Sequence, residues 1–210
     1  MLKIKFFKLA GYCGLLSPIF AIIIISISMY YSPWFSWTEN WLSELAGSTG
    51  ETPIWMANNE IAALLFNIGL IVSGGFGLVC VVAIRNISIL DSKISRIGTM
   101  LLLIDIFALI SVGVFPITVG IIHTISAVFL FMLVPLALMP IGFELRKNNE
   151  KNAGMLIFIL GFISLCSLPF LLIDPPIGGN AVIEMFPVVS LFLSLILFGA
   201  KLVKGRFVLA

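Results

Sequence analysis

Long apolar runs separated by short polar segments make up most of this chain. An α-helix needs roughly 20 apolar residues to cross about 30 Å of hydrocarbon. Six runs reach that length, at residues 9–31, 61–83, 97–115, 121–143, 154–173 and 182–203. The pattern predicts an all-α protein built as a bundle of six transmembrane helices.

The third and fourth runs are joined without a charged break that would separate them. The stretch from Ile97 to Leu145 contains no Lys or Arg and would be about 73 Å long as one helix, more than twice the thickness of the hydrocarbon. Pro116 and Gly120 interrupt it, and both residues disfavour a continuing helix. We expect a tight hairpin at residues 116–120.

Composition places the chain in a bilayer rather than in water. Of its 210 residues, 60% are hydrophobic and 10% are charged, whereas soluble domains carry about 25% charged residues. So few charges cannot cover the surface of a soluble globule. We therefore expect residues 1–210 to form a single integral membrane domain in contact with the lipid bilayer.

The basic residues are distributed unevenly between the loops. All 12 Lys and Arg residues lie before the first run, between the second and third, after the fourth, or at the end of the last. With six spans these segments share one side, and the positive-inside rule makes that side the cytoplasm. The prediction is a multi-pass protein of the cell membrane with both termini cytoplasmic. Basic loops of this kind contact anionic lipid, so no nucleic-acid partner is expected.

The first loop on the opposite side contains every tryptophan of the chain, namely Trp34, Trp37, Trp41 and Trp55. A short amphipathic helix is predicted from Ser36 to Ala46, with Ser36 and Glu39 as a capping box and Gly47 as an exit. Its apolar face has two interpretations. It rests at the lipid headgroups as an aromatic belt, or it forms a lid over the bundle with Glu44 pointing into the mouth.

A few polar residues within or next to the spans predict a pocket in the outer half of the bundle. Helix rise places His123 about 5 Å, Asn67 about 9 Å and Asp105 about 15 Å below the outer surface. An ionised carboxylate at the depth of Asp105 is costly, which favours a protonated or paired acid facing protein. The candidate pocket for a lipid headgroup or small solute comprises Glu44, Glu60, Asn67, Asp105 and His123.

The second run also has a face of small residues. Gly69, Ser73 and Gly77 recur every four residues, which allows close approach of another helix. That helix belongs to the same bundle, to a membrane-protein partner, or to a second copy of the chain.

Catalytic chemistry has little support in the sequence, and no catalytic residue is assigned. One histidine with scattered carboxylates is a poor metal set, so neither a metal nor a cofactor is predicted. A hydrolase built from Ser43, Glu44 and His123 requires the loop helix to fold over the fourth span. Two alternatives to a binding protein remain open: an intramembrane lipid-processing enzyme, and a non-catalytic subunit of a larger complex.

Several short motifs resemble a known family. They are Ser43-Glu44-Leu45, Phe66-Asn67, Gly113-Val114-Phe115-Pro116 and the following His123. In order and spacing they are similar to the mainly archaeal membrane family called domain of unknown function 998, over most of the chain. The resemblance implies a multi-spanning helical fold and no established activity. It draws attention to Ser43, Glu44, Asn67, Pro116 and His123, although here Ala46 precedes the glycine expected directly after Leu45.

Overall fold

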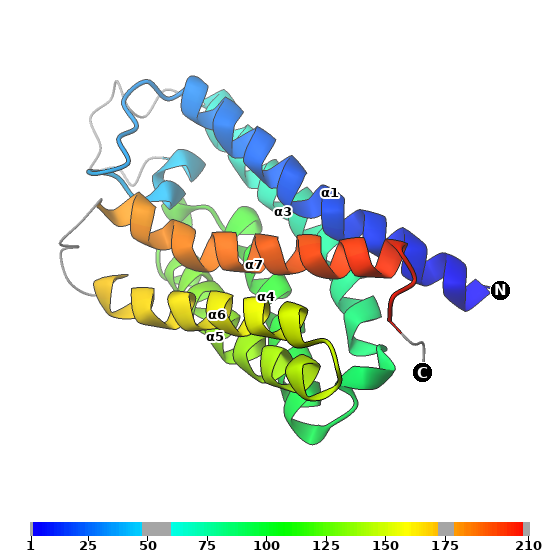
Figure 1. Ribbon diagram of the computed structural model, residues 1–210. Helices are drawn as coiled ribbons and strands as arrows, with labels where there is room; N and C mark the ends of the chain where they lie inside the picture. The colour runs from blue at the N-terminus through cyan, green and yellow to red at the C-terminus, as the bar shows by residue number, and fades with distance from the viewer. Residues whose placement is uncertain (1, 48–59, 172–178, 208–210) are drawn as a thin grey trace.

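A computed structural model describes residues 2–47, 60–171 and 179–207 (Figure 1), and Trp55 lies outside this described part. Within it are six helices that are long and apolar enough to cross a membrane, and no strand. They are α1 (Leu2–Tyr30), α3 (Glu60–Arg85), α4 (Lys93–Val114), α5 (Ile121–Lys147), α6 (Lys151–Ser167) and α7 (Asn180–Val203). Short 3-10 helices connect them: η1 (Leu42–Ala46), η2 (Ser88–Leu90), η3 (Ile117–Val119) and η4 (Leu168–Leu171). The prediction of an all-α, six-helix membrane protein is confirmed.

The long helices run up and down and form a closed arrangement. α1 packs against α3 and α7, α4 against α3 and α5, and α6 against α5 and α7. Fully buried apolar side chains from several of these helices, including Ile106, Leu138 and Leu195, fill the interior. Both chain ends lie at one end of the bundle, which we call the basic end, and η1 lies at the other, which we call the loop end (Figure 1).

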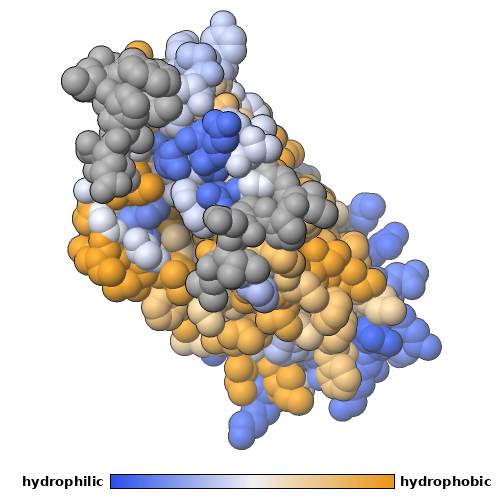
Figure 2. All heavy atoms as spheres, turned by 90° about the vertical axis from the view of Figure 1, so that its left-hand side faces the viewer, coloured by the Kyte–Doolittle hydropathy of each residue, from blue (hydrophilic) through white to orange (hydrophobic). Residues whose placement is uncertain are grey.

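The surface has the polarity that a bilayer requires. Basic residues at the helix termini of the basic end include Lys5, Arg85, Lys93, Arg146 and Lys201. Between the ends, exposed apolar side chains such as Ile22, Phe107, Phe129 and Leu193 cover the flanks. Figure 2, which looks toward the loop end, shows hydrophilic residues gathered there and hydrophobic residues beside them. The flanks are therefore suited to acyl chains and the two ends to water and headgroups.

The hairpin predicted at residues 116–120 is confirmed. α4 ends at Val114, η3 covers Ile117–Val119, and α5 starts after Gly120. The φ of Gly120 is 72°, a left-handed conformation that glycine adopts without the steric penalty of a Cβ.

The small-residue face of α3 is occupied inside the bundle. The Ser17 hydroxyl donates to the Ser73 carbonyl at 2.8 Å, and the Ser73 hydroxyl donates to the Ser17 carbonyl at 2.8 Å. A Cβ on Gly69 would collide with Ile24 of α1, and one on Gly77 would lie 3.0 Å from Ile106 of α4. Helices of the same chain therefore cover Gly69, Ser73 and Gly77, which corresponds to the first of the three alternatives given for this face.

The amphipathic helix of the first loop is shorter than predicted. It covers Leu42–Ala46 instead of residues 36–46, and it is a 3-10 helix. The Asn40 carbonyl accepts a hydrogen bond from Ala181 N–H of α7 at 2.9 Å, while Glu44 N–H donates to the Trp41 carbonyl at 3.1 Å. An α-helix over residues 36–46 would need Glu44 N–H to bond with Asn40, so the contact with α7 replaces that turn. Gly47 ends the element, as expected, with a φ of 143°.

Candidate functional site

The 3-10 helix η1 lies across the loop end with its apolar residues facing inward. Leu42, Leu45 and Ala46 are all buried. Inward packing corresponds to the lid interpretation of this loop, whereas Trp37, on the segment before η1, is 41% exposed. η1 therefore separates the interior of the bundle from the medium at this end.

Three polar contacts fix η1 and the residues before it to the long helices. The Glu184 carboxyl group of α7 accepts the Leu42 N–H at 2.5 Å. One turn earlier in α7, Ala181 N–H donates to the Asn40 carbonyl at 2.9 Å. From α3, the Asn67 amide donates to the Ala46 carbonyl at 3.1 Å. η1 is thus tied to α7 at its beginning and to α3 at its end.

Glu184 is the acid at the centre of this arrangement. It lies in the second turn of α7 and is 3% exposed. The Leu42 N–H occupies part of its hydrogen-bonding capacity, because a carboxylate offers about four lone-pair sites. The carboxylate can therefore hold η1 and still accept a hydrogen bond from a ligand.

A cavity lies directly below η1. Its volume is about 40 Å³, which holds roughly three water-sized atoms. The walls are mainly apolar and come from α1, α3, α4, α5 and α7, with Ile25, Phe66, Leu109, Leu130 and Phe192 among them. Among the described lining residues, three have polar side chains: Ser43 of η1, His123 of α5 and Glu184 of α7.

His123 enters this cavity from the first turn of α5. Its Nδ1 lies 2.8 Å from the carbonyl oxygen of Phe115. Since a carbonyl only accepts, Nδ1 carries the proton in this contact, and in neutral imidazole Nε2 is then a free acceptor. Nε2 is buried and has no hydrogen-bond partner among the described residues. A ligand with an N–H or O–H group would satisfy it.

The other residues predicted for the pocket lie around the cavity and do not line it. Glu44 turns back on its own segment, where its carboxylate accepts from Trp41 N–H at 2.9 Å and from the Asn40 amide at 2.8 Å. Asn67 holds the end of η1, and its Oδ1 is buried without a partner in the described part of the chain. Glu60 is exposed at the first residue of α3.

Asp105 is the deepest of the predicted residues. It is 0% exposed, and neither carboxylate oxygen has a hydrogen-bond partner among the residues described. It precedes the cavity-lining Leu109 by four residues, which places it on the same face of α4, one turn nearer the basic end. Asp105 therefore lies beyond the cavity wall, toward the middle of the bundle.

Sequence reasoning did not select Glu184 or Ser43 for the pocket, although it considered Ser43 as a nucleophile and as part of the family resemblance. Glu184 follows the start of the last apolar run, where an acid is expected at the membrane surface. One signal in the sequence was available: α7 continues apolar on both sides of Glu184, so an acid there needs partners from another element. The partner, Leu42, is 142 residues away.

The polar groups that line the cavity are mainly hydrogen-bond acceptors. An imidazole nitrogen and a carboxylate offer acceptors, and the Ser43 hydroxyl offers one donor and further acceptor capacity. Among the described residues, no group of three His, Cys, Asp or Glu side chains is arranged to hold a metal ion.

Comparison with known proteins assigns a family and no activity. A family model described as protein of unknown function (DUF998) matches residues 15–201. No curated protein and no solved structure matches the chain.

Proposed function

The chain belongs to the DUF998 family, and from its loop-end geometry we propose that it binds a small solute or lipid headgroup bearing hydrogen-bond donors, in the cavity below η1. The observation that carries the proposal is His123 Nε2, which has no partner in the described part of the chain and lies in a cavity that Glu184 also lines. A buried acceptor without a partner is unfavourable by about 1–3 kcal/mol, and a donor-bearing ligand removes that penalty.

The size and polarity of the cavity define the ligand class. A volume of about 40 Å³ suits a compact group of a few non-hydrogen atoms. The apolar wall favours methylene carbons, and the two acceptors favour an ammonium or hydroxyl group. Ethanolamine, which has these features both as a free solute and as a phospholipid headgroup, is the probe we select.

The orientation in the membrane completes the proposal. The positive-inside rule assigns the basic end to the cytoplasm, so the loop end and its cavity face outward. A ligand then arrives from the outer medium or the outer leaflet.

Thermal unfolding of the purified full-length protein tests the proposal. Ethanolamine at a hundredfold excess over its Kd stabilises a binding protein by about 2.7 kcal/mol. We expect a rise in Tm with ethanolamine and none with acetate, whose carboxylate would face acceptors. His123→Ala should remove the shift. A wild-type Tm that ethanolamine leaves unchanged contradicts the proposal, as does an equal shift in His123→Ala.

One observation also favours a second candidate, the intramembrane lipid-processing enzyme. Ser43 and His123 line the same cavity, and the bond to Phe115 leaves His123 Nε2 as the basic nitrogen that would activate a hydroxyl. In that case Ser43→Ala abolishes turnover of a labelled ester lipid while ethanolamine binding persists. Equal turnover in Ser43→Ala and wild type rules out Ser43 as the nucleophile.

A further inference from the structure

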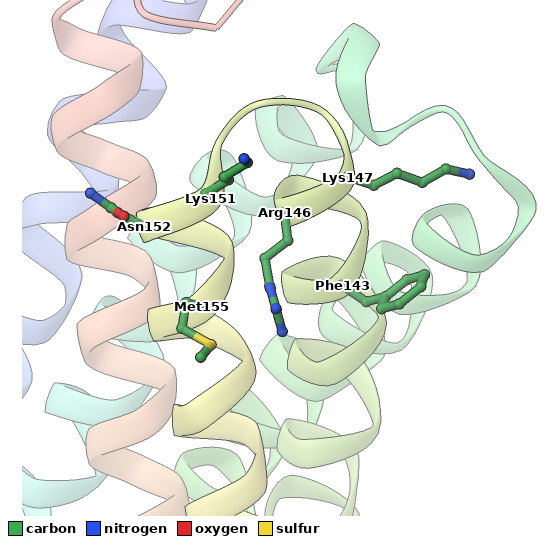
Figure 3. A pocket seen from close by; sticks show the side chains of 6 residues that line it. All are labelled: Phe143, Arg146, Lys147, Lys151, Asn152 and Met155. Carbon is green, nitrogen blue, oxygen red and sulfur yellow. The ribbon is translucent and has the colours of Figure 1, made fainter.

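A second cavity lies at the basic end, between the end of α5 and the start of α6. Its volume is about 640 Å³, and it is open to the surroundings. Its described lining consists of Phe143, Arg146, Lys147, Lys151, Asn152 and Met155 (Figure 3). It is separate from the loop-end site, because Phe143 and His123 lie near opposite ends of α5.

Two glycines bring the backbones of α5 and α6 together at this position. A Cβ on Gly154 would lie 2.6 Å from the Gly142 carbonyl oxygen and 2.7 Å from Arg146 Cγ. The side chain of Arg146 therefore starts in contact with α6. In Figure 3 it runs along the groove between the two helices, toward the level of Met155, while Lys147 and Lys151 lie on either side.

The cavity concentrates positive charge without a matching acid. Within the described residues the ion pairs are Arg96–Asp91 and Lys201–Glu150, so neither involves a cation of the cavity. The nearby acids are engaged elsewhere: Glu144 accepts from the Asn148 amide at 2.9 Å, and Glu150 from Lys201 at 2.6 Å. Three unneutralised cations on adjoining helix ends favour a ligand with more than one negative oxygen.

The apolar part of the lining indicates that this ligand also has a hydrocarbon chain. Phe143 is 53% exposed and Met155 is 44% exposed. Phe143 precedes Arg146 by three residues and Met155 follows Lys151 by four, so each is about one turn from a cation on the side toward the membrane interior. The cavity thus joins a cationic rim to apolar surface on the flank of the bundle.

We propose that this cavity binds an anionic phospholipid. Arg146 takes the phosphate through its planar fork, Lys147 and Lys151 add charge, and the acyl chains follow Phe143 and Met155. Basic pockets between transmembrane helices at the cytoplasmic side suit such headgroups. The proposal does not depend on the loop-end ligand, because no residue is shared.

Native mass spectrometry of the full-length protein in detergent tests the site, with phosphatidylglycerol as the probe. Each basic residue near an anionic headgroup contributes about fivefold in affinity. We therefore expect Arg146→Gln, Lys147→Gln and Lys151→Gln together to weaken phosphatidylglycerol binding by about a hundredfold. The matched control removes three exposed cations at the same end, Lys5, Lys8 and Lys93, by the same change to Gln, and should weaken binding less than twofold.

Single variants and a competition measurement complete the test. If the triple variant fails to fold, the single changes are each measured, with about a fivefold loss expected; Arg146→Lys, which keeps the charge and removes the fork, should also weaken binding. Equal losses in the cavity triple and the control triple overturn the proposal. So does competition by glycerol phosphate at the same concentration as phosphatidylglycerol, because the site would then select a soluble phosphate.

Discussion

Removing the carboxylate of Glu184 is the substitution that most sharply probes how η1 is held. Glu184→Ala leaves the N–H group of Leu42 without its acceptor. This group lies below the protein surface, because Leu42 is 6% exposed and Glu184 is 3% exposed. The change acts on η1 and not on the bundle, whose helices contact one another elsewhere.

The magnitude follows from the loss of that hydrogen bond. A buried donor left without its acceptor costs about 1–3 kcal/mol, and some of the loss is recovered when water reaches an opened lid. We expect Glu184→Ala to lower the free energy of opening η1 by about 2 kcal/mol. Glu184→Gln keeps an oxygen acceptor at the same position, so about 1 kcal/mol is expected.

Hydrogen exchange of the amides in η1 measures this opening directly. Since 1.4 kcal/mol corresponds to a factor of ten, exchange in a peptide covering residues 42–46 should accelerate by about thirtyfold in Glu184→Ala, and about fivefold in Glu184→Gln. Glu39→Ala, an exposed acid in the same loop, is the matched control and should stay within about twofold of wild type.

Two results of the hydrogen-exchange experiment would contradict this reasoning. Exchange in Glu184→Ala at the wild-type rate would show that η1 is not held from α7. Equal acceleration in Glu39→Ala and Glu184→Ala would show that the effect is one of loop charge and not of the hydrogen bond.

Three other predictions concern packing, polarity and sidedness. Gly154→Ala should destabilise the protein by about 1–3 kcal/mol, because the new Cβ would meet backbone atoms of α5. The control Gly75→Ala, with no atom within 4 Å of the new Cβ, should leave Tm unchanged or raise it slightly. Equal Tm values for the two variants in thermal unfolding would contradict the close approach of α5 and α6. Asp105→Leu removes an acid with no described hydrogen-bond partner. It should therefore raise the free energy of unfolding by about 1–3 kcal/mol and raise Tm with it. A fall in Tm would mean that the carboxyl group is paired. The orientation is tested in a protein whose native cysteines are replaced by alanine. An impermeant maleimide should label Thr38→Cys in intact cells and Lys93→Cys only after the cells are permeabilised. The reverse pattern would contradict the proposed orientation.

The apolar runs predicted the spans well because length and hydrophobicity determine what can cross a bilayer. The breakers Pro116 and Gly120 located the hairpin for an equally local reason, and His123 lies in the first turn of α5 as expected. Predicted span edges were less accurate: the first run began at residue 9, while α1 starts at Leu2, because a helix continues past the apolar segment into its basic flank.

The details of the site depend on contacts that no local pattern contains. The path of η1 is fixed by Ala181 and Glu184, which lie far from it in the sequence. The local pattern predicted a helix over residues 36–46, whereas in the structure the Asn40 carbonyl bonds to Ala181 of α7 and the helix covers only Leu42–Ala46. The spacing of Gly69, Ser73 and Gly77 indicated a close helix contact, and only the tertiary structure identified α1 as the principal helix that makes it.

An experimental structure determined with ethanolamine present tests the central claim most directly. The account predicts density for ethanolamine below η1, with its donors within hydrogen-bond distance of His123 Nε2 and the Glu184 carboxylate. An apolar side chain filling that space, or ethanolamine bound elsewhere while His123 Nε2 pairs with the protein itself, would contradict it.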